Sequence, residues 1–378
     1  MSKTPEGIFL ARPERPGEGV SLAVKDLLDT AGLVTTYGSA IFAEHVPATT
    51  AEAVLRLEAA GYVNVGKTNL HEFAYGITSE NPHFGTVPNP TAPGRIAGGS
   101  SGGSAAALAA GLADAALGTD SGGSIRIPAA CCGVVGFKPT FDLVSTDGCF
   151  PLAPSFDHVG PMARTVEDCE RALTVLAREF APRALNDLRD LRFGVAWAEH
   201  ADPLVRERVE EAAGVLGAKP ADFPFPTKTS PVFMREVADV HRELYAENAE
   251  LYGEDVAIKI ERCLAVGGAE ASAARRARDD YRRAAEQAFA GFDVLATPTL
   301  ASVAPRVGIG DAELRERMIR FTYPFNALGW PALALPCGPA EDGLPASVQL
   351  VGKPGEDALV LAAGRLLASL VRGTPAAS

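Results

Sequence analysis

Two glycine-serine stretches carry the side chains best suited to chemistry. The first, GGSSGGS, spans residues 98–104, and the second, DSGGS, spans residues 120–124. Residues 98–102 also fit G-x-S-x-G, a pattern in which the serine is a nucleophile held at a tight turn. The first stretch can therefore be a phosphate-binding loop, a turn that holds a nucleophile, or a flexible linker.

The residues around the first stretch argue against two of these roles. A phosphate-binding loop of the G-x-x-x-x-G-K-[ST] type needs a lysine where this chain has Ser104. A dinucleotide-binding loop follows a strand, whereas Gly98 follows a proline-rich loop. A linker is disfavoured because an apolar, alanine-rich helix is predicted to begin at once, over residues 105–112.

A serine nucleophile needs a base, and two kinds are available. The histidines that follow the first stretch are His158, His200 and His241, and none lies near the C-terminal end, where a hydrolase histidine usually falls. A neutral lysine is the other option. Lys25 follows the apolar segment SLAV, and burial would lower its pKa because it disfavours the charged form. A surface charge is the alternative interpretation of this lysine.

The second stretch offers backbone donors for a developing negative charge. The N–H groups of residues 121–124 can converge on a carbonyl oxygen, since small residues let it approach. The alternative is a tight turn between a strand and a helix, which would need one glycine rather than two flanked by serines.

Several longer motifs resemble those of the amidase signature family. In chain order they are KDLLDTAG, GKTNLHEFAYG, GGSSGGSAAALAAG, ALGTDSGGSIRIPAACCGVVGFKPT, GPMARTVEDC, FDVLATPTLASVAP and GLPASVQLVGKPGEDA. The match is strong over residues 20–180, moderate over 290–370 and weak over 181–290. The resemblance implies an α/β fold in which a central mixed, twisted β-sheet is covered by helices on both faces.

The resemblance also implies a Ser–cis-Ser–Lys triad. Lys25 falls on the lysine of the motif, and Ser100 on the bridging serine, with the Gly99–Ser100 peptide bond cis. Ser124 falls on the nucleophile. The implied oxyanion hole is formed by backbone N–H groups of the loop before and at the nucleophile: Ser121, Gly122, Gly123 and Ser124.

Further motif positions are expected to support this site. Asp120 and Arg126 flank the nucleophile, and Arg126 either braces the loop, which is the favoured interpretation, or binds a substrate carboxylate. A second motif is interpreted as structural support for the wall of the active site, through Asn69, His71, Glu72 and Tyr75.

The elements that must position these residues alternate between strands and helices, which favours an α/β fold. Strands are expected at residues 20–24, 62–65, 115–119, 191–196, 293–297, 332–336 and 346–351. Helices are expected at residues 50–60, 105–112, 203–216 and 357–371. We expect a single domain over residues 1–378, with a charged helical excursion over 233–290 that faces solvent and shapes the substrate pocket.

Composition excludes several classes of function. The 378 residues carry a net charge of −12, so a general basic surface for nucleic acid or anionic membrane is absent. No run of 18 apolar residues predicts a membrane span, and the N-terminus lacks an apolar signal core, so a cytoplasmic protein is expected. The six histidines are scattered and the six cysteines form no C-x-x-C pair. We therefore expect neither metal nor cofactor, and free thiols.

The predicted function is hydrolysis of a small amide through a serine acyl-enzyme, with release of ammonia or an amine. Ile127 stands where the glutaminase subunit of tRNA-dependent amidotransferases usually has glutamine, which favours a stand-alone amidase. The alternatives are a carbamate or urea-type hydrolase, an inactive scaffold, or that glutaminase subunit. The amide, any partner subunits and the oligomeric state, with a homodimer as one option, stay open.

Overall fold

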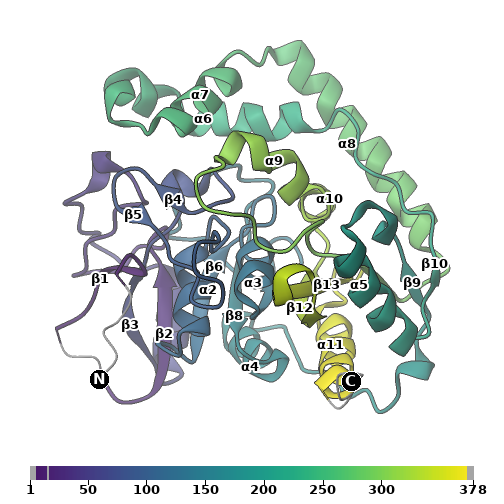
Figure 1. Ribbon diagram of the computed structural model, residues 1–378. Helices are drawn as coiled ribbons and strands as arrows, with labels where there is room; N and C mark the ends of the chain where they lie inside the picture. Colours follow the sequence, from purple (N-terminus) through teal and green to yellow (C-terminus); the bar gives the residue numbers. More distant parts are fainter. Residues whose placement is uncertain (1–5, 15–16, 373–378) are drawn as a thin grey trace.

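The computed structural model describes residues 6–14 and 17–372. A long twisted sheet runs through the molecule, with helices packed on both of its faces (Figure 1). Helices α6 (Ser230–Asn248) and α7 (Glu254–Leu264) lie at the top of that view, α8 (Gly268–Phe289) runs from there down the right-hand side, and α9 (Asp311–Ile319) lies below α6.

Within the described residues, the sheet has eleven strands in the order β1-β3-β2-β6-β8-β7-β12-β13-β11-β9-β10. It is mixed, since β2 pairs in parallel with β3 and β6, whereas β12 pairs antiparallel with β7 and β13. A separate pair is formed by β4 and β5. The strands are β1 Phe9–Ala11, β2 Val20–Lys25, β3 Tyr62–Thr68, β4 Glu80–Asn81, β5 Gly85–Thr86, β6 Ala115–Thr119, β7 Val135–Lys138, β8 Val159–Ala163, β9 Phe193–Val195, β10 Lys219–Pro220, β11 Val294–Pro298, β12 Ala332–Pro339 and β13 Pro345–Val351.

The α-helices cover the sheet and build the helical excursion. They are α1 Glu52–Ala59, α2 Gly102–Ala109, α3 Arg126–Cys132, α4 Val166–Leu176, α5 Pro203–Val215, α6 Ser230–Asn248, α7 Glu254–Leu264, α8 Gly268–Phe289, α9 Asp311–Ile319, α10 Tyr323–Leu328 and α11 Asp357–Arg372. The predicted strand over residues 115–119 and the predicted helices over 203–216 and 357–371 agree with β6, α5 and α11 to within one residue at each end.

Successive residues of β2 point alternately into two hydrophobic cores, which lie on opposite faces of the sheet. Leu22 and Val24 pack with side chains of α1, α4, α5 and α11. Ala23 packs on the other face with side chains of α2 and α3. The structure thus confirms the predicted α/β class, with helices on both faces of a mixed sheet.

Helix α2 begins at Gly102, three residues before the predicted start. Its first turn packs against backbone: the Gly103 N–H donates to Asn69 O at 3.0 Å, and a Cβ on Gly103 would lie 2.4 Å from that oxygen. Only glycine allows this approach. The sequence of this first turn is typical of a loop, because glycine and serine have low helix propensity. These small residues allow the close backbone contact instead.

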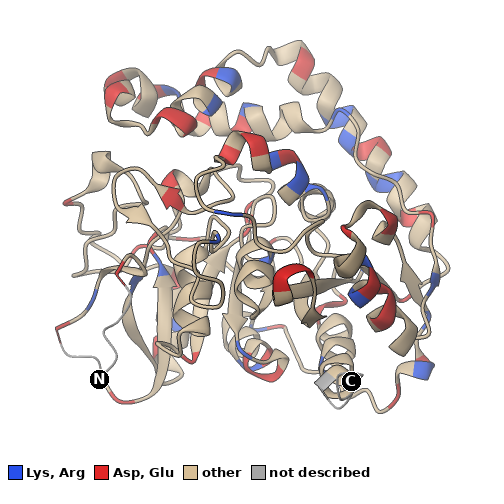
Figure 2. Ribbon diagram, in the orientation of Figure 1, with Lys and Arg blue, Asp and Glu red and all other residues tan. Residues whose placement is uncertain are grey.

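Charged side chains concentrate on the outer helices (Figure 2). On α8, Asp279 and Asp280 form exposed ion pairs with Arg282 and Arg283. These pairs agree with the solvent-facing interpretation of the charges in residues 233–290, but Lys259 and Arg278 of the same region are buried, so that interpretation is wrong for them. Among the described residues, no helix has both the length and the apolar character needed to cross a lipid bilayer.

Candidate active site

Lys25, the last residue of β2, points into a fully buried polar site. Its Nζ lies 2.7 Å from Ser100 Oγ and 2.6 Å from Thr119 Oγ1, both within hydrogen-bonding distance. Burial lowers the pKa of Lys25 to about 7, although nearby Cys149, Asp120 and Asp157 act in the opposite direction. A lysine with this pKa is about half neutral at pH 7, so a substantial fraction can act as a base.

Ser100 lies between β3 and α2 in the first glycine-serine stretch, and the Gly99–Ser100 peptide bond is cis, as expected. Its carbonyl oxygen accepts hydrogen bonds from the His71 N–H at 3.2 Å and the Ser79 hydroxyl at 3.3 Å. The backbone of Ser100 is therefore held from one side by the segment after β3, while its hydroxyl faces Lys25.

The next residue, Ser101, ties this loop to the second stretch. Its N–H donates to Ser124 O at 3.1 Å. Its hydroxyl donates to Thr119 O at 3.2 Å and accepts from the Thr119 N–H at 3.3 Å. The structure thus brings Lys25, Ser100 and Ser124 to one place, but no hydrogen bond joins the Ser100 and Ser124 hydroxyls in the described part of the chain.

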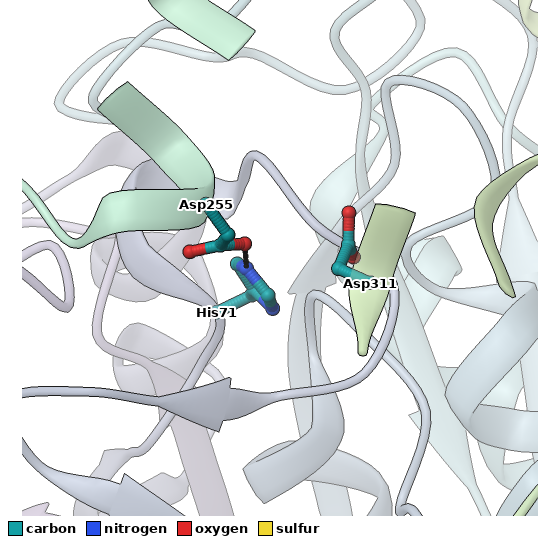
Figure 3. Close-up of side chains that lie close together, drawn as sticks. All are labelled: His71, Asp255 and Asp311. Carbon is teal, nitrogen blue, oxygen red and sulfur yellow. Dashed lines mark hydrogen bonds and ion pairs between the residues drawn. The ribbon is translucent and has the colours of Figure 1, made fainter. Parts of the chain in front are cut away.

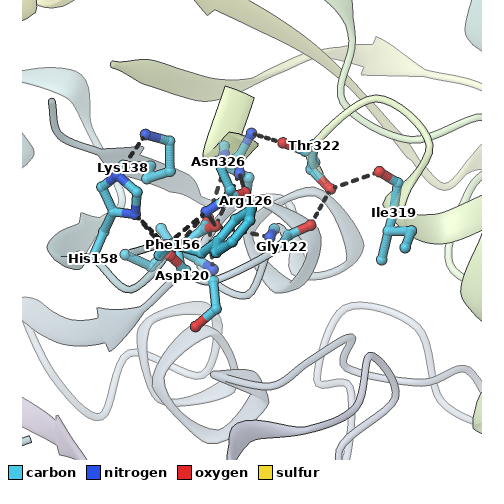
Figure 4. Close-up of polar contacts among 12 residues, drawn as sticks. Asp120, Gly122, Arg126, Lys138, Phe156, His158, Ile319, Thr322 and Asn326 are labelled. Atoms are coloured by element: carbon cyan, nitrogen blue, oxygen red, sulfur yellow. Dashed lines mark hydrogen bonds and ion pairs between the residues drawn. The ribbon is translucent and has the colours of Figure 1, made fainter. Parts of the chain in front are cut away.

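Ser124 lies on a loop that is held by a buried ion pair (Figure 4). Arg126 and Asp120 face each other with two N–H···O contacts of 2.9 Å. Burial alone would raise the pKa of Asp120, but the Arg126 guanidinium beside it holds that pKa well below the usual range. The remaining guanidinium N–H groups donate to Thr322 O, Gln349 Oε1 and Asn326 Oδ1. Arg126 is also fully buried, so it braces the loop and has no exposed surface to offer a substrate carboxylate.

Gly123 departs from the expected set of oxyanion donors. Its N–H donates to Asp120 Oδ1 at 2.8 Å, so this donor is already used. Its φ of +134° and the position of Thr322, whose Oγ1 would lie 2.3 Å from a Cβ on Gly123, both require glycine. In the described residues, no protein acceptor is bonded to the N–H groups of Ser121, Gly122 and Ser124. These three remain as candidate donors.

His158, one of the candidate histidine bases, does not contact a serine hydroxyl. It is buried, and its Nδ1 lies 2.7 Å from Phe156 O while its Nε2 lies 3.2 Å from Lys138 Nζ (Figure 4). Burial and the adjacent Lys138 lower the pKa of His158 well below its usual value. Its backbone pairs with Asp120, so His158 supports the loop from behind.

A cavity of about 750 Å³ opens beside Gly122. Its wall comes from the second glycine-serine stretch and from helices α6, α7, α9 and α10. Apolar and aromatic side chains are among the residues that line this cavity: Phe233, Met234, Ile319 and Tyr323. A larger cavity of about 840 Å³ is lined by residues 11–14, 17, 30–34, 58 and 62–64 and not by Ser124. Of these two cavities, the one beside Gly122 adjoins the candidate nucleophile loop.

The segment after β3 joins the site to α7 and α9 through a cluster of charges (Figure 3). His71 Nε2 lies 2.9 Å from Asp255 Oδ2, and Asp311 lies close by. The Lys259 ammonium contacts both carboxylates. Because a lysine already neutralises these acids, the donor set suits an ion-pair network rather than a metal ion. The cluster agrees with the supporting role expected for His71.

Four residues of the site were not expected from the sequence: Thr119, Thr322, Asn326 and Gln349. Thr119 directly precedes Asp120, so its place at the end of a strand was a usable signal. Gln349 stands inside the apolar run of β13, where a polar side chain predicts a buried partner. Asn326, whose Nδ2 donates to Asp120 O at 2.9 Å, carries no such signal.

Comparison with known proteins places the chain in a family. The family model described as Amidase matches residues 8–361. The chain belongs to the amidase family. Members are amide hydrolases, and the match covers the strands, loops and helices that build the site described above.

Relatives within the amidase family span most of the chain. A glutamyl-tRNA(Gln) amidotransferase subunit of Lachnospira eligens is 34% identical, covering 96% of this chain and 86% of the relative. The AtzE subunit of 1-carboxybiuret hydrolase from Pseudomonas sp. (strain ADP) is 36% identical, covering 93% and 84%. A crystal structure of an amidase, 36% identical, superposes with a TM-score of 0.85 and covers 93% of this chain and 84% of that one.

Proposed function

We propose that the protein hydrolyses the amide bond of a small molecule through Lys25, Ser100 and Ser124. The observation that carries the proposal is the 2.7 Å contact between Lys25 Nζ and Ser100 Oγ, buried and with the pKa of Lys25 lowered to about 7. A lysine in this state can take a proton from a serine near neutral pH.

In the proposed reaction, neutral Lys25 accepts a proton from Ser100 as Ser100 accepts one from Ser124. Ser124 Oγ then attacks the amide carbonyl carbon, and the C–N bond breaks as Ser100 returns a proton to the leaving nitrogen. Water hydrolyses the acyl-enzyme by the reverse transfers. For the proton to move, the Ser124 hydroxyl must rotate or shift until it bonds Ser100 once substrate is present.

The N–H groups of Ser121, Gly122 and Ser124 are proposed to bind the oxyanion. Gly122 supports this role, because it lines the cavity while its own carbonyl is tied to Thr322 Oγ1 at 2.7 Å. Donors fixed in this way stabilise a developing charge without reorganisation. Gly123 acts indirectly, by fixing the loop through Asp120.

A second candidate is a glutaminase subunit of an amidotransferase, which the similarity to the Lachnospira eligens protein favours. It would use the same serines, but with glutamine as ammonia donor and with partner subunits. Ile127, fully buried on α3 beneath the loop, differs from the glutamine usual in that subunit, which supports a stand-alone amidase. Carbamate or urea-type hydrolysis is a further option within the same site.

Labelling with a fluorophosphonate, read by mass spectrometry, tests the nucleophile. We expect one adduct on the peptide that contains Ser124, absent in Ser124→Ala, together with hydrolysis of at least one member of an amide panel (aliphatic, aromatic, dipeptide amide, glutamine and carbamate). Ser124→Ala should keep the wild-type melting temperature but lose turnover. Turnover at the wild-type rate in Ser124→Ala would exclude the proposed nucleophile.

A further inference from the structure

Residues of helix α9 line the cavity beside Gly122. At its C-terminal end the chain meets the nucleophile loop, where Thr322 Oγ1 donates to Gly122 O at 2.7 Å and to Ile319 O at 3.3 Å. Ile319 and Arg315, one turn apart on this helix, both line the cavity. A group bound at Gly122 can therefore extend along α9 towards Arg315.

The Arg315 guanidinium lies over an aromatic ring and keeps its hydrogen-bond donors. Its Cζ lies 5.1 Å from the centroid of the Tyr75 ring, a cation–π contact that holds the side chain in place. The side chain is 29% exposed, and its nearest carboxylate oxygen, Asp311 Oδ1, lies 4.0 Å away. That oxygen already contacts the Lys259 ammonium. Among the described residues, no protein acceptor is hydrogen-bonded to Arg315.

The buried cations near the site differ from Arg315, because each of them is hydrogen-bonded to protein acceptors. All N–H groups of Arg126 are used, as described above. Arg278 donates to Ala327 O, to the Ser155 hydroxyl and to Ser155 O. Lys259 contacts two carboxylates and Tyr75 O. The other charged groups that line this cavity and are not part of the ion-pair network are solvent-exposed: Glu254, Arg262 and Glu316.

A guanidinium that has no hydrogen-bonded acceptor and lies on an aromatic ring is suited to a carboxylate, which it can bind through two parallel hydrogen bonds. Ile319 and Arg315 are four residues apart, so their Cα atoms are separated by about 6 Å along the helix axis. The residues that line the cavity together with Gly122 and Arg315 include the apolar and aromatic side chains of Phe233, Ile319 and Tyr323. These features together fit an amide whose acyl part is an apolar chain that ends in an anion.

We infer that Arg315 is a specificity-determining residue that binds the distal carboxylate of an ω-carboxyl amide, such as the monoamide of a dicarboxylic acid several methylenes long. The inference rests on the proposed function, since it takes Ser124 as the nucleophile and Gly122 as the place of the scissile carbonyl. The apolar chain lies along α9, and the carboxylate replaces water on the guanidinium.

Two matched substrates test this inference: adipic acid monoamide, which carries the distal carboxylate, and hexanamide, which has the same chain without it. Wild-type protein should prefer the monoamide by about 30- to 100-fold in kcat/KM, which lies within the range for hydrogen bonds to a charged group. Arg315→Gln should remove this preference through a higher KM and leave hexanamide hydrolysis within about threefold of wild type. Arg315→Lys should restore part of it.

Arg317→Gln is the control on the same helix, because Arg317 is exposed, pairs with Asp202 and does not line the cavity. It should retain the wild-type preference. An equal preference in wild type and Arg315→Gln, or a wild-type preference for hexanamide, would overturn the role of Arg315 while leaving Ser124 catalysis intact.

Binding without turnover separates this inference from the proposed function. In the Ser124→Ala background, isothermal titration calorimetry should show that adipic acid monoamide binds, and that adding Arg315→Gln weakens binding by the same 30- to 100-fold. Binding that depends on Arg315, but with no turnover by wild-type protein, would reject the proposed reaction only. Absence of binding, or binding unchanged in Arg315→Gln, would reject the role of Arg315.

Discussion

Two lysines at the ends of neighbouring strands are equally buried but have different partners. Lys25 ends β2 and Lys67 is the penultimate residue of β3, and neither has exposed surface. Lys67 Nζ lies 3.1 Å from Asp26 Oδ1 and also donates to Leu28 O and Thr35 Oγ1. Lys25 bonds only to hydroxyls, those of Ser100 and Thr119, among the described residues.

This difference separates a structural cation from a candidate base. Burial lowers the pKa of both lysines, and in Lys67 the carboxylate of Asp26 is the main influence in the opposite direction. A hydroxyl group can form a hydrogen bond with a neutral amine as well as with an ammonium, since it both donates and accepts. Lys25 can therefore gain and lose a proton without losing its partners. A contacting carboxylate favours the ammonium instead. The two lysines therefore differ in role because their partners differ, not because their burial differs.

Replacing Lys25 should give the largest effect on activity. Lys25→Met removes the proposed base, and kcat/KM should fall by about 10³- to 10⁴-fold. The melting temperature should not fall, because an apolar side chain of similar length replaces a buried amine that contacts no carboxylate. Steady-state kinetics and thermal denaturation measure the two effects. Activity within tenfold of wild type would remove Lys25 from the mechanism.

Replacing Lys67 should give the opposite pattern. Lys67→Met leaves the buried Asp26 without its cation, and the free energy of unfolding should fall by about 3–5 kcal/mol, as measured by urea denaturation. The folded fraction should still label with fluorophosphonate. The double variant Lys67→Met/Asp26→Asn is the control, and it should recover part of the loss because no unpaired charge remains. A stable but inactive Lys67→Met would contradict the assignment.

Removing one hydroxyl partner of Lys25 should give the smallest effect. Thr119→Val deletes one of the two contacts that orient Nζ, and kcat should fall by about 5- to 10-fold with little change in KM, the size of one net hydrogen bond. Thr299→Val is the control, since Thr299 is equally buried and its hydroxyl bonds Ser347, away from the lysine. Equal losses of activity in the two variants would indicate a general packing effect.

Much of the fold could be predicted because its strands are continuous apolar runs. Strands β2 and β6 were located to within one residue of their ends. Helix α4 is missing from the sequence-based expectations, although Thr165 and Asp168 form the N-terminal cap of an amphipathic segment. The early start of α2 could not be predicted, since it depends on the backbone of a segment distant in sequence.

The candidate site also has features that the sequence predicts and features that it does not. The motifs predict Lys25, Ser100 and Ser124 as the catalytic residues, because each motif position requires a particular residue type in a short stretch. They do not show that the Gly123 N–H is used by Asp120, since that depends on how the loop folds back. The free donors of Arg315 were likewise not foreseen, because a lone arginine in a weakly matched region carries no signal until Tyr75 and the cavity are placed beside it.

The pH dependence of kcat/KM tests the central claim, a neutral Lys25, most directly. Protonation of Lys25 removes the base, so the account predicts a constant value above pH 8 and a fall with an apparent pKa of about 7, tenfold per pH unit below about pH 6. A neutral amide such as hexanamide is the right substrate because it does not titrate in this range. A profile that stays flat down to pH 5 would contradict the account.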